Sequence, residues 1–163
     1  MGQPNLIKLL FSLLALGLVP PASAQEPTET AANIAARTAF LARLSKEQQL
    51  QNIGWKLIQG NAEFCENIIP AVGLQLHDIA SYENPDIVRI VAGLEGDIGV
   101  LTVAAESPGY RAGLRHGQEI VDVAGLDPTT ISVASRNDWR RAKQLHDEID
   151  ASLISDHSVT LTL

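Results

Sequence analysis

The chain has 163 residues, of which 45% are hydrophobic, so it is long enough for one domain with its own core and a further segment. Aromatic residues make up only 4%, and we therefore expect a mostly aliphatic core. The formal net charge of −7 argues against nucleic acid or an anionic membrane surface as a partner.

The first 24 residues are typical of a secretory signal peptide. Lys8 is the only charge, an apolar run follows over residues 9–19, and Ala22-Ser23-Ala24 is an A-x-A cleavage site. The alternative is a retained membrane anchor, but the run is well short of the ~20 residues that span a bilayer. We expect cleavage after Ala24, no membrane span in the mature chain and a periplasmic location.

Residues 25–66 are expected to form a helical N-terminal segment. Helix-forming residues predict one helix over 31–44 and a second over 46–59, because Ser45 with Gln48 three residues later matches a capping box. The alternative is one long bent helix. An apolar face is predicted by helical spacing in the second half: Leu50, Ile53, Leu57 and Ile58.

Three residues near the end of this segment carry separate expectations. Trp55 and Phe64 should pack against the domain that follows. Cys65 is the only cysteine, although an exported protein would usually pair its thiols. It is either a buried thiol that packs as a small hydrophobic group, or one half of a disulfide whose other half lies in a second molecule or in sequence absent here.

Residues 67–163 alternate short strands with two or three short helices, which predicts an α+β domain built as a small barrel or sandwich. Strands are expected over 72–77, 98–104, 119–123 and 158–163. Helices should begin at Asn84-Pro85, at Ser107-Pro108 and at Asn137. The last should run to about Ser152 and turn one row of residues to the core: Ala142, Leu145, Ile149 and Leu153.

Residues 99–125, GVLTVAAESPGYRAGLRHGQEIVDVAG, resemble the PDZ domains of exported bacterial proteases such as the HtrA family. The shared pattern is a strand, then S-P-x-x-x-A-G-L, then x-x-G-x-x-I and V-x-G. Gln118 and Ala124 depart from it, standing where Asp and Asn are common, which should weaken the hydrogen bonding of two turns. The resemblance extends more loosely over residues 70–163 and implies a PDZ-like fold.

The resemblance also implies a binding site. PDZ domains add an extended peptide, often a C-terminus, as a strand at a sheet edge beside a helix. Backbone N–H groups of the preceding loop receive the carboxylate. The matching loop is 71–74, the edge strand 74–77, and the flanking helix the one starting near Asn137. The expected peptide-binding residues are Ala71, Val72, Gly73, Leu74, Gln75, Leu76, Trp139 and Ala142. The alternatives are that residues 72–76 form an ordinary core strand and that Trp139 covers the core.

The chain shows no pattern of catalytic or metal-binding residues. Its four histidines are widely separated, no H-E-x-x-H pair is present, and no G-x-S-x-G elbow occurs. We therefore expect no catalytic residue, no metal ligand and no cofactor. Arg136, Arg140 and Arg141 are interpreted as ordinary surface charge, with an acidic partner as the alternative.

Residues 53–74 also look like the region that precedes the PDZ domain in some exported proteins that carry an HtpX-like zinc metallopeptidase domain. Three hypotheses follow. The first is a non-catalytic module that binds a peptide or protein C-terminus. The second is the regulatory PDZ portion of a periplasmic zinc metallopeptidase, with a protease domain or protease as its partner. The third is a degenerate PDZ platform for protein–protein contacts that has no peptide ligand.

Overall fold

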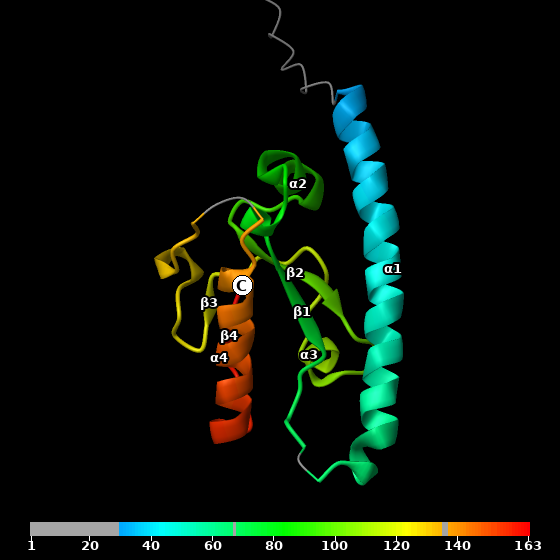
Figure 1. The fold of residues 1–163 in the computed structure, drawn as a ribbon, viewed down its shortest axis with the longest axis vertical. Helices are drawn as coiled ribbons and strands as arrows, with labels where there is room; N and C mark the ends of the chain where they lie inside the picture. The colour runs from blue at the N-terminus through cyan, green and yellow to red at the C-terminus, as the bar shows by residue number, and fades with distance from the viewer. Residues whose placement is uncertain (1–29, 67, 135–136) are drawn as a thin grey trace, which may run out of the picture.

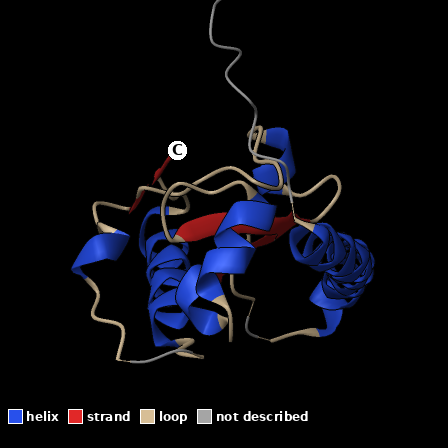
Figure 2. Cartoon of the chain, turned by 90° about the horizontal axis from the view of Figure 1, so that it is seen from above, coloured by secondary structure: helices blue, strands red, loops and turns tan. Residues whose placement is uncertain are grey.

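The computed structural model describes residues 30–66, 68–134 and 137–163, so the predicted signal peptide lies outside the described residues. Its helices are α1 (Ala31–Asn61), α2 (Pro85–Ala92), α3 (Pro108–Arg111) and α4 (Arg140–Asp156). Its strands are β1 (Leu74–Asp78), β2 (Ile98–Val103), β3 (Asp122–Val123) and β4 (Leu161–Thr162). Figure 1 shows β1 and β2 lying between α4 and α1, and the view from above in Figure 2 agrees.

The described strands form two small antiparallel sheets and no closed barrel, so the fold is α+β but the expected barrel or sandwich is not formed. β1 pairs with β2, with an irregularity between Gln75 and Leu76, and β3 pairs with β4. The strands expected over 119–123 and 158–163 shrink to two residues each. Residues 117–120 do bond to β2, through an isolated antiparallel bridge between Glu119 and Gly99, and in the turn just before it the Gln118 side chain accepts the Arg115 N–H at 2.6 Å. Gln118 thus supplies a turn hydrogen bond that its departure from the pattern was expected to remove.

The core lies between the β1–β2 sheet and α4, and it is aliphatic, as composition indicated. Its buried members are Leu74, Leu76, Ile98, Val100, Val103, Leu114, Ile120, Val123, Leu145, Ile149 and Leu153. Three of the four α4 residues predicted to face the core are buried, and Ala142 is half-buried. The helical period in the sequence therefore oriented α4 correctly.

A buried ion pair joins the first turn of α4 to the end of β1. Arg141 donates from Nε and Nη2 to the two carboxylate oxygens of Asp78, both at 2.6 Å, and from Nη2 to Asp97 at 2.8 Å. The interpretation of Arg141 as surface charge is therefore wrong, because its guanidinium neutralises a carboxylate that has no contact with solvent. Arg140 remains largely exposed and pairs with Asp138, and Arg136 lies outside the described residues.

α4 begins two residues later than predicted, with Trp139 rather than Asn137 at the N-cap position. Asn137 has a left-handed backbone, with φ of 60°, and does not cap the helix. The carboxylate of Asp138 instead accepts the N–H of Arg140 at 3.1 Å and that of Ala134 at 3.0 Å. Hydrogen bonds from the Arg140 side chain and these two N–H groups hold the pKa of Asp138 well below its usual range.

α1 is one continuous helix, so the two helices predicted on either side of Ser45 are not formed and the single-helix alternative is confirmed. Ser45 lies in the middle of α1. The reason is tertiary, because both halves of the helix contact the domain: Phe40, before Ser45, packs against the His77 ring, while Gln48 donates to the Val103 carbonyl at 2.8 Å and Asn52 accepts the Ala105 N–H at 2.9 Å. The two hydrogen bonds hold the C-terminal end of β2, and a break at Ser45 would change how they are placed relative to the Phe40 contact. No α1 residue is fully buried.

The apolar face predicted for α1 points into solvent. Leu50, Ile53 and Leu57 are 66%, 58% and 60% exposed, and Phe64 is 76% exposed rather than packed on the domain. Cys65 is also exposed, so it does not act as a buried hydrophobic group. Trp55 alone packs as expected and is half-buried. Within the described part of the chain, no helix combines the length and apolar character needed to cross a membrane.

Candidate functional site

One edge of β1 faces α4 rather than a third strand. Among the described residues β1 pairs only with β2, and α4 runs along its other side in the opposite direction. The N–H of Leu76 points to this side and is donated to Nε2 of His146, at 3.4 Å. Burial lowers the pKa of His146, which favours its neutral form, and in that form Nε2 can accept the Leu76 N–H. The strand edge is therefore accessible to an added strand only if His146 moves aside.

A cavity of about 190 Å³ opens where the chain enters β1. The loop before the strand, α4 and α1 each supply one wall. The lining residues are Ala71, Val72, Gly73, Leu74, His146, Ile149, Asp150, Gln51, Gly54, Trp55 and Ile58. The structure thus brings the predicted loop, residues 71–74, together with the predicted flanking helix around one hollow.

The loop is held in place by the S-P motif. The carbonyl of Gly73 accepts the Ala104 N–H at 2.7 Å, and the carbonyl of Val72 accepts the Gly109 N–H at 2.9 Å. Gly73 has a φ of 71°, and a Cβ there would stand 2.4 Å from Cβ of Ser107. Ser107 is itself buried and caps α3 by accepting the Tyr110 N–H. Glycine is required at position 73 by backbone conformation and by packing, whatever the loop binds.

The cavity walls are mostly apolar, with a few polar groups at the edge. Val72, Leu74 and Ile149 line its interior side. Nε1 of Trp55 is buried and has no hydrogen-bond partner among the described residues, so a ligand would reach this donor only after the indole ring moves. Asp150 is exposed beside the opening and would oppose a second carboxylate that came close to it.

Four predicted site residues do not line this cavity. Trp139 is 61% exposed and stands at the opposite end of α4, so it neither covers the core nor reaches the hollow. The side chain of Gln75 is bonded to Thr102 at 3.0 Å. Ala142 lies beside Arg141, near that same end of α4, and Leu76 contributes only its backbone at the strand edge.

Sequence reasoning missed the α1 wall and the α4 residues His146, Ile149 and Asp150. Their spacing of three and four positions does place these three on one side of a helix, a signal that was available. Nothing in the sequence indicated that Gln51, Gly54 and Trp55 would meet them, because that contact depends on how α1 docks.

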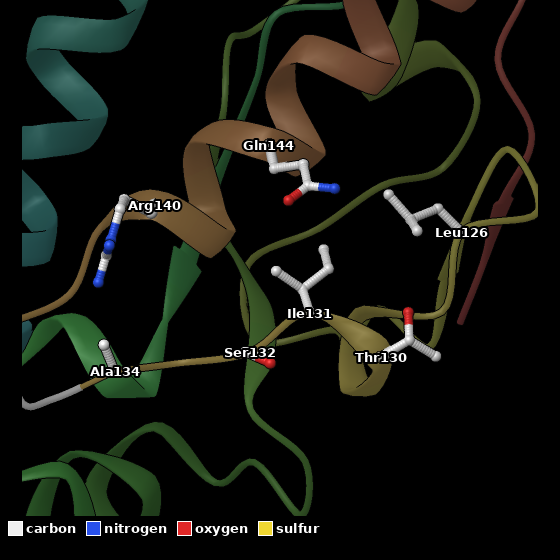
Figure 3. Close-up of a pocket in the computed structure, with 7 residues that line it drawn as sticks. All are labelled: Leu126, Thr130, Ile131, Ser132, Ala134, Arg140 and Gln144. Carbon is white, nitrogen blue, oxygen red and sulfur yellow. The ribbon is translucent and has the colours of Figure 1, made fainter.

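A second hollow, of about 500 Å³, lies between the first turns of α4 and the loop that follows β3. Figure 3 shows Gln144 and Ile131 reaching toward it, while Arg140 points away. Arg140 is occupied by its ion pair with Asp138. No predicted site residue lines this hollow. In the described ranges, no three His, Cys, Asp or Glu side chains gather so that they could hold a metal ion.

Comparison of the chain with protein-family models, with curated proteins and with solved structures finds no match.

Proposed function

We propose that this chain is an exported, PDZ-like protein that binds an extended peptide or protein C-terminus by strand addition to β1 beside α4, and that it is non-catalytic by itself. The observation that carries the proposal is the cavity at residues 71–74, enclosed between the start of β1 and α4. A peptide lying along this edge would place its last side chain in that cavity.

The chemistry of the walls indicates the kind of ligand. An aliphatic last residue would contact Val72, Leu74 and Ile149, while its backbone would pair with β1 in place of His146. The peptide can bind only after the hydrogen bond from the Leu76 N–H to His146 is broken. The cost of breaking that bond reduces the net binding free energy. We expect dissociation constants in the micromolar range or weaker, which corresponds to a binding free energy of about −8 kcal/mol at best.

Gly54 offers a clean way to block the cavity. It lines the hollow from α1, and a Cβ added there meets nothing within 4 Å. Gly54→Leu should fill the cavity without disturbing the core, and replacing a helical glycine favours the helix. Gly60→Leu is the matched control, because Gly60 lies on the same helix, is equally unobstructed and does not line the cavity. A Gly73 variant is unsuitable because it would clash with Ser107.

The measurement is fluorescence anisotropy of the purified protein against a library of peptides with free C-termini. We expect Gly54→Leu to weaken the best peptide at least tenfold, Gly60→Leu to leave it unchanged, and C-terminal amidation to weaken it. Equal binding by both variants would show that the peptide occupies another site.

One observation favours a second candidate, the interaction platform without a peptide ligand. Trp55 and Ile58 of α1 already wall the cavity, and His146 already occupies the β1 edge. This candidate predicts that the unmodified protein binds no peptide in the library, even at millimolar concentration. The regulatory role in a zinc metallopeptidase rests on the resemblance of residues 53–74 alone.

A further inference from the structure

The outer side of α1 carries a stripe that the rest of the described chain does not cover. We call it the α1 stripe, and its seven members are all exposed: Ala35, Ala39, Ala42, Lys46, Leu50, Ile53 and Leu57. They follow one another at intervals of four and three positions. The side of α1 that docks on the domain is a different one, with Phe40, Gln48, Asn52 and Trp55.

The intervals run four, three and four on each side of Lys46, which is an 11-residue repeat of the kind that lets two helices pack side by side with a slight right-handed supercoil. The stripe is also divided by size, with alanines before Lys46 and large aliphatic residues after it. Ala42 and Leu50 each lie four positions from Lys46, Ala39 and Ile53 lie seven, and the outermost pair lies eleven. The stripe is therefore complementary to itself when it is reversed about Lys46.

We propose that the α1 stripe binds the same stripe of a second copy of this chain in antiparallel orientation. In this arrangement Ala42 faces Leu50 of the other copy, and Ala39 faces Ile53, so that a small side chain meets a large one at every level except the centre, where Lys46 meets Lys46. A parallel pair would set alanine against alanine in one half and leave gaps there, which costs packing. The antiparallel register removes the exposed leucines and isoleucine from water.

Lys46 sets the strength of this contact. The two Lys46 side chains meet at the symmetry axis, where like charges repel, although their long stems let the ammonium groups diverge into solvent. The stripe covers 22 helical steps, roughly 33 Å. A single helix–helix contact of this length falls below the ~800 Å² per partner of a standard stable interface. The dimer should therefore be weak, micromolar or above, and tighter at higher salt.

The proposal stands apart from the peptide site. The α1 residues that wall the cavity, Gln51, Gly54, Trp55 and Ile58, are not members of the stripe. The dimer therefore leaves the cavity open, and failure of either proposal leaves the other unaffected.

Disulfide trapping tests the register directly. In a Cys65→Ser background, the double variant Ala39→Cys with Ile53→Cys places two thiols 14 positions apart, about 21 Å along one helix, too far to pair within a chain. The antiparallel dimer brings each thiol opposite its counterpart, so mild oxidation should give a covalent dimer. The matched control is Thr38→Cys with Gln49→Cys, which is exposed on the same helix but out of register.

Sedimentation equilibrium gives an independent test, because two substitutions should change the association constant in opposite directions. Lys46→Ala should strengthen dimerisation at least threefold by removing the repulsion, and Leu50→Lys should weaken it by a similar factor. Both positions are exposed, so circular dichroism should show an unchanged fold. The proposal is overturned if the control variant is trapped as fast as the in-register variant, or if both substitutions leave the association constant unchanged. Spontaneous pairing of native Cys65 between chains would also overturn it, because the α1 C-termini lie roughly 45 Å apart in the antiparallel dimer.

Discussion

The two long helices of this protein are attached to the β1–β2 sheet by different forces. α4 buries Arg141, Leu145, Ile149 and Leu153, whereas α1, nearly twice as long, buries no residue fully. Each buried leucine or isoleucine of α4 contributes about 1.5–3 kcal/mol by leaving water. α1 relies on two hydrogen bonds to the end of β2, each contributing about 1 kcal/mol, and on half-buried aromatic rings.

The comparison teaches that length does not measure how firmly a helix is attached. α4 belongs to the core and should unfold with it in one cooperative step. α1 is a peripheral element that should open locally at a lower free energy than the domain. Both elements wall the candidate peptide site, so one wall is fixed and the other can move.

The sharpest way to break the α4 attachment is Arg141→Ala. It leaves the buried Asp78 carboxylate without its bidentate partner, and we expect the free energy of unfolding to fall by about 3–5 kcal/mol. Urea denaturation measures the loss. Arg140→Ala, one residue earlier, removes an ion pair whose arginine is largely exposed although Asp138 is buried, and it should cost less, about 1 kcal/mol. Similar losses from the two variants would contradict the buried pair.

Acid should weaken the side of the sheet that faces α1. Burial, reinforced by the nearby His116, lowers the pKa of His77 to about 4, and Phe40 of α1 packs against its ring. Because the unfolded chain takes up the proton near pH 6.5, stability present above that pH is lost as pH falls through the window toward 4. The expected loss is about 3 kcal/mol.

Denaturation at pH 7 and pH 4.5 checks this, with ring protonation of His77 followed by NMR. His77→Gln should remove most of the loss, while His146→Gln should remove a smaller part, because burial lowers the pKa of His146 in the same direction. A pH dependence left intact by His77→Gln would exclude His77 as its source.

The smallest expected effect concerns the α1 anchors. Gln48→Ala and Asn52→Ala each remove one hydrogen bond to the end of β2 and should each cost about 1 kcal/mol. Hydrogen exchange should show faster exchange of α1 amides in both variants, with the β1–β2 amides unchanged. Gln49→Ala, at an exposed neighbouring position, is the control. Uniformly faster exchange across the domain would mean that α1 is part of the cooperative core.

Prediction from sequence succeeded where a short-range pattern of residues is compatible with only one local structure. The 3.6-residue period of Leu145, Ile149 and Leu153 placed them in the core, and the Ser107-Pro108 pair marked the start of α3. The same kind of pattern in Leu50, Ile53 and Leu57 identified a real apolar face, yet that face is exposed. Periodicity shows which residues share a side of a helix but not which side another element will cover.

The candidate site also has parts that the sequence predicted and parts that only the structure revealed. Its loop, residues 71–74, and its flanking helix came from a resemblance that covers more than half of the chain, and they meet at the cavity. The α1 wall and the His146 contact with Leu76 came only from the structure. Both join residues more than ten positions apart, whose approach depends on chain-wide packing.

By itself, the sequence determined the aliphatic character of the core, most helix and strand locations, and the loop that precedes β1, because these follow from local backbone preferences and residue spacing. Only the tertiary structure decided that α1 is continuous, that Arg141 is buried and that the cavity has a third wall. Each of these depends on partners distant in sequence: His77, Val103 and Ala105 for α1, Asp78 for Arg141, and the docked α1 for the cavity. A buried charge needs an opposite charge, and a buried hydrogen-bonding group needs a partner, and here both come from distant parts of the chain. A local sequence pattern does not show which residue that partner will be.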